Sequence, residues 1–333
     1  LQICASSLSP NGLAAISFNV LPGWRVQQIV RDLCMAASGG NQGRNGVAKA
    51  RALLAEVAAS EGLERPYGLA VKQAAHRLLK RPDSYIAGEF LAPFNEPLDF
   101  KTFASKAAAV ELHYICDGEL PACTPEFMHP TAAATIRSNQ GNPTAIQARL
   151  DFFTGRTFRR ALLSRRPSRG EPDANALKRL HFLSELREVG DAFVNSAGAA
   201  ARPRTALQAR TLAALAQVFP ATLSFDELVE HTGPAGSEFP EELLEMAGTG
   251  KIELSSLPFM AGRASSPRAF AVAEMQARTG QKWLASRLHR PTVPSSAAIK
   301  VLTSLDQGAH PDLDPAAWRD GLLKLERLAL LEP

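Results

Sequence analysis

The hydrophobic pattern near the start of the chain predicts one short strand. The run from Leu13 to Phe18 contains no charge, and it ends at Asn19, just before Pro22-Gly23-Trp24. An uncharged run of this kind is typical of a strand covered on both faces, as in a parallel or mixed sheet flanked by helices. We therefore expect a sheet here, although most of the chain that follows has a helical pattern.

Helical spacing dominates the next part of the chain. In the first predicted helix the apolar side chains share one face: Val26, Ile29, Val30, Leu33 and Cys34. Two Ala- and Leu-rich helices follow, separated by Pro66, and Asp99 is placed to cap another helix. The alternation in LHYICDGEL predicts a second strand, and a further helix is expected from Pro143 to Leu150 and on toward Leu163.

Two segments interrupt this pattern and read as connectors. Residues 164–179 are charged and contain prolines, and residues 196–204 are rich in small residues and proline. Between them, LKRLHFLSELREV fits either a helix or a strand. Beyond Arg204 the pattern gives a helix, a capping box in SFDELVEHTG, a helix and a strand around Ile252. That order is typical of a winged helix, and the last seventy residues partly repeat it.

Composition narrows the class of protein. The 333 residues suffice for about two to three domains, and the hydrophobic share of 45% is ordinary for a globular protein. The sequence contains no membrane-spanning run and no secretory signal, so we expect no membrane association. Four scattered cysteines without a CxxC pair favour a reducing cytoplasm. The first residue is Leu rather than Met, so we expect the chain to be cut from something longer.

The sequence contains no self-contained catalytic motif. GGNQGRNG follows a helix and lacks the Lys-Ser/Thr of a phosphate-binding loop, and the histidines lack metal-ligand spacing, so no metal site is expected. Arginines gather between Arg149 and Arg210, which we interpret as a solvated helix face and a linker. The net charge of +4 is mild, and the predicted helix Phe239–Ala247 is acidic, which disfavours nucleic acid as a partner.

Several longer stretches carry a resemblance to a known family. LSPNGLAAISFN resembles a late strand of class I S-adenosylmethionine-dependent methyltransferases, with Asn11 in place of a glycine. The run that includes FNVLPGWRVQQIVRDL, PYGLAVKQAAHRLLKRPDSYIAGEFLAPFNEPLDFKTFASKAA and LDFFTGRTFRRALL is similar to the bacterial methyltransferase regulatory-domain family, which includes the rickettsial protein lysine methyltransferases. The tail, ending in LLKLERLALLEP, is similar to the C-terminal winged-helix region of the same enzymes. One departure is the pair Gly88 and Phe90, where relatives often carry His.

The resemblance implies a mainly α fold with small β elements (α+β) and a particular division of the chain. Residues 1–24 would be the remnant of a Rossmann-like methyltransferase sheet, and residues 25–165 a helical regulatory or middle domain with its core at 45–130. A connector would cover 166–204, and a winged-helix-like domain 205–333. If LHYICDGEL forms the strand next to Leu13–Phe18, residues 25–97 are an insertion between two strands of one sheet.

The resemblance also implies a function and a cofactor. The family's glycine-rich cofactor loop is not in this sequence, so S-adenosylmethionine is expected only in a full-length enzyme, and this chain alone is expected to bind none and to be inactive. The chain would be the regulatory and substrate-recognition portion of a methyltransferase acting on protein lysine. The alternative is a non-enzymatic winged-helix adaptor that binds a protein partner or DNA. A homodimer is compatible with either function.

Six residues are candidates for the substrate side of such an enzyme. Asn19 lies at the carboxyl end of the predicted strand, where open α/β sheets bind ligands, and Trp24 is placed to wall a pocket. A carboxylate or aromatic wall would help to orient an amine, which favours four more residues around Pro93 and Pro97: Tyr85, Glu89, Asn95 and Glu96. For these four, caps and turn hydrogen bonds are the competing interpretation, and no residue can be assigned a catalytic role.

Overall fold

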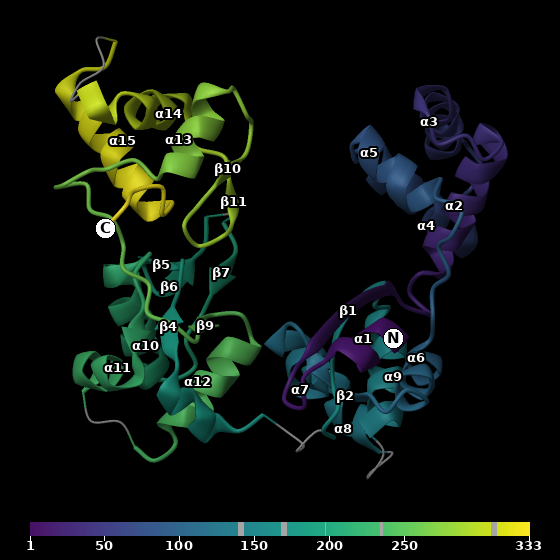
Figure 1. Ribbon diagram of the computed structural model, residues 1–333, viewed down its shortest axis with the longest axis horizontal. Helices are drawn as coiled ribbons and strands as arrows, with labels where there is room; N and C mark the ends of the chain where they lie inside the picture. The colour runs from purple at the N-terminus through teal and green to yellow at the C-terminus, as the bar shows by residue number, and fades with distance from the viewer. Residues whose placement is uncertain (139–142, 168–171, 197, 234–235, 308–311) are drawn as a thin grey trace. The chain divides into compact units, whose positions relative to one another are not determined.

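The computed structural model describes residues 1–138, 143–167, 172–196, 198–233, 236–307 and 312–333. They form two compact units, Leu1–Gly170 and Glu171–Pro333, each of which is described by itself. Both units combine helices with short antiparallel strands, so the expected α+β class is confirmed (Figure 1). The boundary between the units falls inside the expected connector 166–204, of which residues 168–171 and 197 lie outside the described part.

A three-stranded sheet in the order β1-β3-β2 anchors the first unit. The strands are β1 (Ala14–Asn19), β2 (His113–Asp117) and β3 (Phe158–Ser164), and both pairings are antiparallel. The parallel or mixed sheet predicted from the sequence is therefore wrong for the described strands. Direct pairing of β2 with β1 is also wrong, because β3 lies between them in the same sheet.

Only one face of β1 is covered within the described residues. Ala14, Ile16 and Phe18 pack toward one core cluster, whereas Ala15 and Ser17 are exposed. The strand therefore alternates with period two, and the predicted cover on both faces is wrong. The covering layer is helix α6 (Phe100–Ala108), whose Phe103 ring stacks on Phe18 with centroids 4.2 Å apart.

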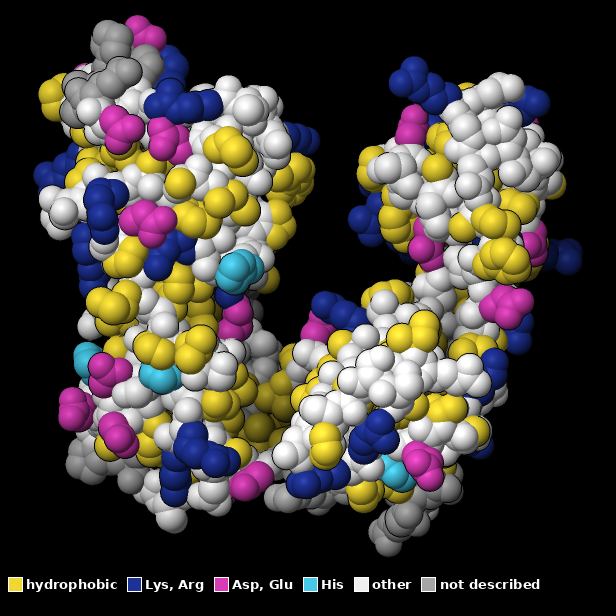
Figure 2. Space-filling model, viewed as in Figure 1, with side chains coloured by type: hydrophobic (Ala, Val, Ile, Leu, Met, Phe, Trp, Pro, Cys, Tyr) yellow, Lys and Arg dark blue, Asp and Glu magenta, His cyan; other side chains and the backbone are white. Residues whose placement is uncertain are grey.

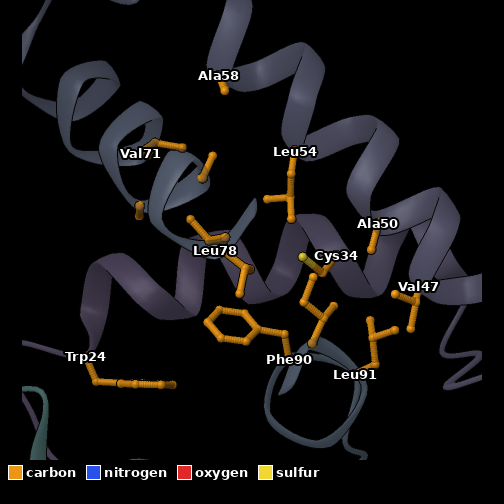
Figure 3. Packing of buried hydrophobic residues seen from close by; sticks show 14 residues of the cluster. Trp24, Cys34, Val47, Ala50, Leu54, Ala58, Val71, Leu78, Phe90 and Leu91 are labelled. Atoms are coloured by element: carbon orange, nitrogen blue, oxygen red, sulfur yellow. The ribbon is translucent and has the colours of Figure 1, made fainter. Parts of the chain in front are cut away.

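Helices pack side by side after β1 and form their own core. They are α2 (Arg25–Ser38), α3 (Arg44–Ala59) and α4 (Pro66–Leu79), and α4 begins at Pro66, where a missing N–H costs nothing. Cys34 and Leu54 are fully buried between them, and Leu78 and Phe90 close the same cluster (Figure 3).

The remaining elements of the first unit are short apart from one helix. The chain continues through α5 (Asp83–Tyr85) and η1 (Ile86–Phe90), a turn of π-helix, to α6, which Asp99 caps as predicted. The helix α9 (Pro143–Thr154) ends well before Leu163, so the predicted extension is wrong: residues from Phe158 onward form β3. Five short helices complete the unit: α1 (Gln2–Ser7), η2 (Leu120–Ala122), α7 (Pro125–Met128), η3 (Pro130–Ala132) and α8 (Ala133–Arg137).

The second unit begins with two small antiparallel sheets. One has the order β8-β4-β9, from Leu223–Ser224, His181–Leu183 and Glu253–Ser255, and the other the order β5-β6-β7, from Arg187–Val189, Ala192–Val194 and Ala200–Ala201. The ambiguous stretch LKRLHFLSELREV thus begins in the 3-10 helix η4 and continues through the strands β4 and β5. Around them lie η4 (Ala174–Arg179), α10 (Ala206–Val218), α11 (Phe225–Thr232) and α12 (Phe239–Gly248), and α11 carries the predicted capping box of Ser224 and Glu227.

The end of the chain forms a helical cluster with a small hairpin. Its elements are α13 (Ala271–Arg278), β10 (Leu284–Ala285), β11 (Pro291–Thr292), α14 (Ser296–Thr303), η5 (Leu305–Gln307) and α15 (Pro315–Arg327). The core between these helices contains Val301, Leu302 and Leu325. The sequence SSAAIKVLTSLDQG predicts a helix that ends at Gly308, and this residue lies outside the described part of the chain. Among the described helices, none is both long and apolar enough to cross a bilayer.

Candidate functional site

Three of the six candidate residues meet at the carboxyl end of β1. The side-chain amide of Asn19 donates to the carboxylate oxygen Oε1 of Glu89 at 2.6 Å and to Oδ1 of Asn95 at 2.9 Å. The amide of Asn95 in turn donates to the same Glu89 oxygen at 3.0 Å and to the Glu89 carbonyl at 2.8 Å. We call these three residues the amide–carboxylate cluster.

The local sequence explains how residues seventy positions apart come together. The π-helical turn η1 places Glu89 on its half-exposed side while Ile86 and Phe90 point into the helical core. Prolines 93 and 97 then hold the chain extended up to Leu98. There the Leu98 amide donates to the Asn19 carbonyl, and its own carbonyl accepts from Leu21, both at 3.0 Å. The segment after η1 is therefore held against the end of β1 by backbone as well as side chains.

The cluster leaves the Asn19 amide no N–H group for a ligand. Both N–H groups are already donated, to Glu89 and Asn95, so Asn19 positions these two residues and can offer a ligand only its oxygen Oδ1. Glu89 uses Oε1 for both side-chain bonds, and no hydrogen bond to Oε2 is recorded within the described part of the chain. The second carboxylate oxygen is thus the acceptor that the cluster holds ready.

The other three candidates lie differently. The Tyr85 ring lies 6.0 Å from that of Phe90 and is half-exposed; burial and the Glu89 charge raise the pKa of its phenol, against the Arg81 guanidinium. Trp24 is buried at the edge of the helical core, so it packs there rather than lining an open pocket (Figure 3). Its indole Nε1 has no hydrogen-bond partner among the described residues. Glu96 is exposed and outside the cluster.

A second polar cluster is buried in the same unit, where β2 and β3 meet helix α9. Arg159 on β3 is fully buried and binds Asp117 at 2.5 Å and Asp151 at 2.9 Å. Arg156 reaches the same Asp117 oxygen at 2.9 Å. The guanidinium of Arg159 also lies 4.2 Å from the centroid of the Phe100 ring, so α6, α9, β2 and β3 are joined at one point.

Burial and charge act against each other in this cluster. Burial raises the pKa of the Asp151 carboxyl, although the Arg159 guanidinium opposes that shift. Burial acts to lower the pKa of Arg159, but Asp151 and Asp117 outweigh it and raise the pKa overall. Burial likewise raises the pKa of the Tyr114 phenol, which donates to Asp117 at 2.8 Å. Two arginines facing two aspartates make the cluster electrically balanced, which fits a structural role.

This cluster was not predicted from the sequence. Arg156 and Arg159 belong to the arginine-rich stretch that we interpreted as a solvated helix face, and for these two residues that interpretation is wrong. The signal was present in the alternation of FRRALLS, where Arg159, Ala161 and Leu163 share one buried face of a strand. A charged residue at such a position implies a buried partner, which the spacing along the chain does not identify.

Neither cluster resembles a metal site. Within the described ranges, no group of three or more His, Cys, Asp or Glu side chains is placed to hold a metal ion. A cavity of about 140 Å³ beside Arg156 and Asp117 is small for a cofactor of nucleotide size. What the described site can do is hold a half-buried carboxylate, Glu89, in a fixed orientation at the end of a strand.

One family model matches part of the first unit. Residues 82–165 match the family model described as a predicted methyltransferase regulatory domain. That segment includes Glu89, Asn95 and the buried arginines. The match over this segment agrees with the resemblance to the methyltransferase regulatory-domain family that the sequence predicted.

Two curated relatives and two solved structures are similar to this chain. The uncharacterized protein RP789 of Rickettsia prowazekii (strain Madrid E) is 30% identical to this chain over 49% of its length. The uncharacterized protein RP028 of the same organism is 32% identical over 32% of this chain. The matches span 30% and 44% of those relatives, less than half of their length. PKMT2 from Rickettsia typhi shares the fold at a TM-score of 0.76 and 18% identity, over 99% of this chain and 76% of that one. The structure of PKMT2 in complex with AdoHcy matches with a TM-score of 0.75 and a sequence identity of 20%, over the same shares of the two chains.

Proposed function

We propose that this chain is the substrate-recognition and regulatory portion of an S-adenosylmethionine-dependent methyltransferase that acts on protein lysine. One observation carries the proposal: Asn19, Glu89 and Asn95 form a hydrogen-bonded cluster at the carboxyl end of β1. Ligands of open α/β sheets bind beyond that end of the strands. The family match over residues 82–165 and the fold shared with PKMT2 point to the same chemistry.

The cofactor would be bound by a domain that these residues do not supply. Strand β1 pairs with β3 along one edge, and its other edge has no strand partner in the described part of the chain. An open edge of a short, uncharged strand is a template for a further strand. We propose that this edge joins the sheet of a Rossmann-like cofactor-binding domain, so that residues 1–24 complete that domain.

The amide–carboxylate cluster would then face the methyl acceptor. Methyl transfer to an amine requires the neutral amine to be aligned with the sulfonium methyl group, and alignment supplies much of the rate. A carboxylate at a fixed position can hold the acceptor through a hydrogen bond from the amine. In this proposal Glu89 contacts the acceptor amine, Asn19 and Asn95 are positioning residues, and Tyr85 supplies an aromatic wall.

The second unit would contribute recognition of a protein. Its elements α10, β8, α11, α12 and β9 follow the order of a winged helix. Two of the three carboxylates on α12 are engaged within the unit: Glu245 binds Arg204 at 2.7 Å and Glu242 accepts from Thr205 at 2.7 Å. On the face drawn in Figure 2, positive and negative side chains are interspersed without a field of one sign. A face without a field of positive charge favours a protein partner over DNA.

Calorimetry tests whether another domain binds the cofactor. Titration of S-adenosylmethionine or AdoHcy into this chain is expected to give no binding at micromolar concentrations. Micromolar binding to the isolated chain would contradict the proposal that another domain holds the cofactor. The acceptor class is tested separately by mass spectrometry of the product of the full-length enzyme, which should contain methylated lysine.

A further inference from the structure

A cavity in the second unit has no part in the function proposed above. It measures about 400 Å³ and is lined from β5, the end of α10, the loop around β11 and the last turns of α15. Cavities of about 300–1,000 Å³ are the usual size for small-molecule sites. Its walls come from segments far apart in the sequence, so the fold itself shapes the cavity.

Positive charge gathers at this cavity. Its lining contains four cationic residues, Arg187, Arg290, Lys324 and Arg327, against one acidic residue, Glu185. Two of the cations are already paired with carboxylates outside the cavity: Arg290 with Glu253, and Lys324 with Asp320. The charge left for the cavity therefore comes from Arg187 and Arg327.

Arg327 is held in place but not neutralised by its own contacts. Its guanidinium donates to the carbonyl of Glu185 at 3.1 Å and lies 5.4 Å from the centroid of the Phe219 ring. Burial lowers the pKa of Arg327, and the nearby charge of Arg187 lowers it further, while Glu185 opposes the shift. Arg187 itself is exposed, and no ion pair is recorded for it within the described residues. An anion between the two arginines would relieve this repulsion.

The rest of the lining combines an apolar wall with four hydroxyl side chains, those of Ser196, Ser286, Thr292 and Ser295. Leu288, Val293 and Leu328 face the cavity together with Phe219. A bare phosphate or sulfate would satisfy the arginines and leave this wall unused. An acid with an apolar body would use both parts, because Arg binds carboxylates through paired hydrogen bonds and the body would cover apolar surface.

We propose that this cavity binds an organic carboxylate with an apolar body, with Arg187 and Arg327 on the carboxylate and Leu288 and Val293 on the body. Two sources supply that chemistry: a free medium-chain acid, or the C-terminal carboxylate of a peptide that ends in an apolar residue. The inference does not depend on the methyltransferase proposal.

Calorimetry with charge-matched probes tests the site on the whole chain. Octanoate represents the free acid, a short peptide ending in Leu represents the peptide carboxylate, and octylamine and the same peptide amidated at its C-terminus are the controls. We expect one acid to bind saturably and its control to bind at least tenfold more weakly, since the control lacks the carboxylate that accepts hydrogen bonds from the arginines. The stronger acid identifies the source. Equal binding of acid and control, or no saturable binding of either acid, would overturn the proposal.

Variants locate the binding. Arg187→Gln, an exposed residue whose loss should not disturb folding, and Arg327→Gln should each weaken binding of the preferred acid by about tenfold or more. Arg319→Gln is the matched control, because Arg319 is exposed on the same helix α15 and does not line the cavity. The acid should also shift the methyl NMR signals of Val293 and Leu328. An Arg319→Gln loss equal to that of Arg187→Gln, or unshifted Val293 and Leu328 signals, would refute the site.

Discussion

Asn19 donates a 2.6 Å hydrogen bond to the carboxylate of Glu89, and this bond joins the last residue of β1 to the π-helical turn η1. Short hydrogen bonds to an ionised group are the stronger ones in proteins. The bond fixes a half-buried carboxylate beside the end of a strand, together with Asn95. The helical core and the sheet of the first unit are therefore coupled at the place where the proposed acceptor would bind.

Removing the Asn19 amide should loosen this junction. In Asn19→Ala the Glu89 carboxylate loses one of its two side-chain donors, and a hydrogen bond of this kind contributes about 1.5–3 kcal/mol. We expect the Leu21 and Leu98 amides, which form the backbone bonds of the junction, to exchange with solvent about tenfold faster. Glu96→Gln, at an exposed position, is the control and should leave both rates unchanged. Unchanged exchange in Asn19→Ala would show that the side-chain cluster does not hold the junction.

The buried arginine should be far more sensitive than its neighbour on the strand. Arg159→Met leaves Asp117 with Arg156 alone and deprives Asp151 of its closest cation, so unfolding of the first unit should become easier by about 3–5 kcal/mol. Arg160→Met removes an exposed charge from the same strand and should change stability by about 0.5 kcal/mol or less. Urea unfolding followed by Trp24 fluorescence, with Trp283 and Trp318 replaced by Phe, reports on this unit. Similar losses of unfolding free energy in both variants would show that the buried cluster does not stabilise the first unit more than an exposed ion pair does.

Gly23 is required by a close backbone contact. A Cβ built at Gly23 would lie 2.2 Å from the carbonyl oxygens of Gly155 and Arg156, just before β3. Since backbone cannot yield as a flexible side chain does, Gly23→Ala should cost about 1–3 kcal/mol by the same Trp24 measurement. At Gly88 a Cβ would meet nothing, so Gly88→Ala should be neutral. A neutral Gly23→Ala would mean that the turn after β1 tolerates displacement.

The Asp99 cap gives the first unit a pH-dependent contribution. A hydrogen bond from the Thr102 hydroxyl, with support from the backbone, holds the pKa of Asp99 below 3.8. Because the pKa is lower in the folded state, the cap stabilises fully above the unfolded pKa, and this contribution is lost as the pH falls through the folded pKa. Asp99→Asn, which keeps a capping oxygen, should be close to wild type at pH 3 and weaker at pH 7, whereas Asp99→Ala should lose about 1 kcal/mol at pH 7. The free energy of unfolding of the wild type should therefore exceed that of Asp99→Asn by less at pH 3 than at pH 7. A difference that grows toward pH 3 would contradict a lowered pKa of Asp99.

Local signals in the sequence predicted much of the fold, because each depends on neighbouring residues. The apolar face of α2, the Asp99 cap and the Ser224–Glu227 capping box were all predicted and are present. Sheet order was not predicted, since β3 pairs with β1 from far along the chain. The adjacent Arg159 and Arg160 also obscured the apolar alternation of β3, so this segment was predicted to be the end of a helix.

The candidate site was predicted in part for a similar reason. Asn19 was identified from its place at a strand end, and Glu89 and Asn95 from the chemistry of a proline-rich segment. The structure brings these three together. Trp24 lies in the core of the helices instead, because its indole is large and apolar enough to fill the end of that core. Nothing in the spacing of Glu96 distinguished it from its neighbour Asn95.

In the function proposed above, these residues position a methyl acceptor for a cofactor that another domain holds. Transfer of labelled methyl from S-adenosylmethionine to protein, measured on filters with this chain alone and joined to a cofactor-binding half, tests it most directly. We predict transfer only by the joined enzyme, reduced at least tenfold by Glu89→Gln and unchanged by Glu96→Gln. Transfer by this chain alone, or a joined enzyme that is indifferent to Glu89→Gln, would contradict the account.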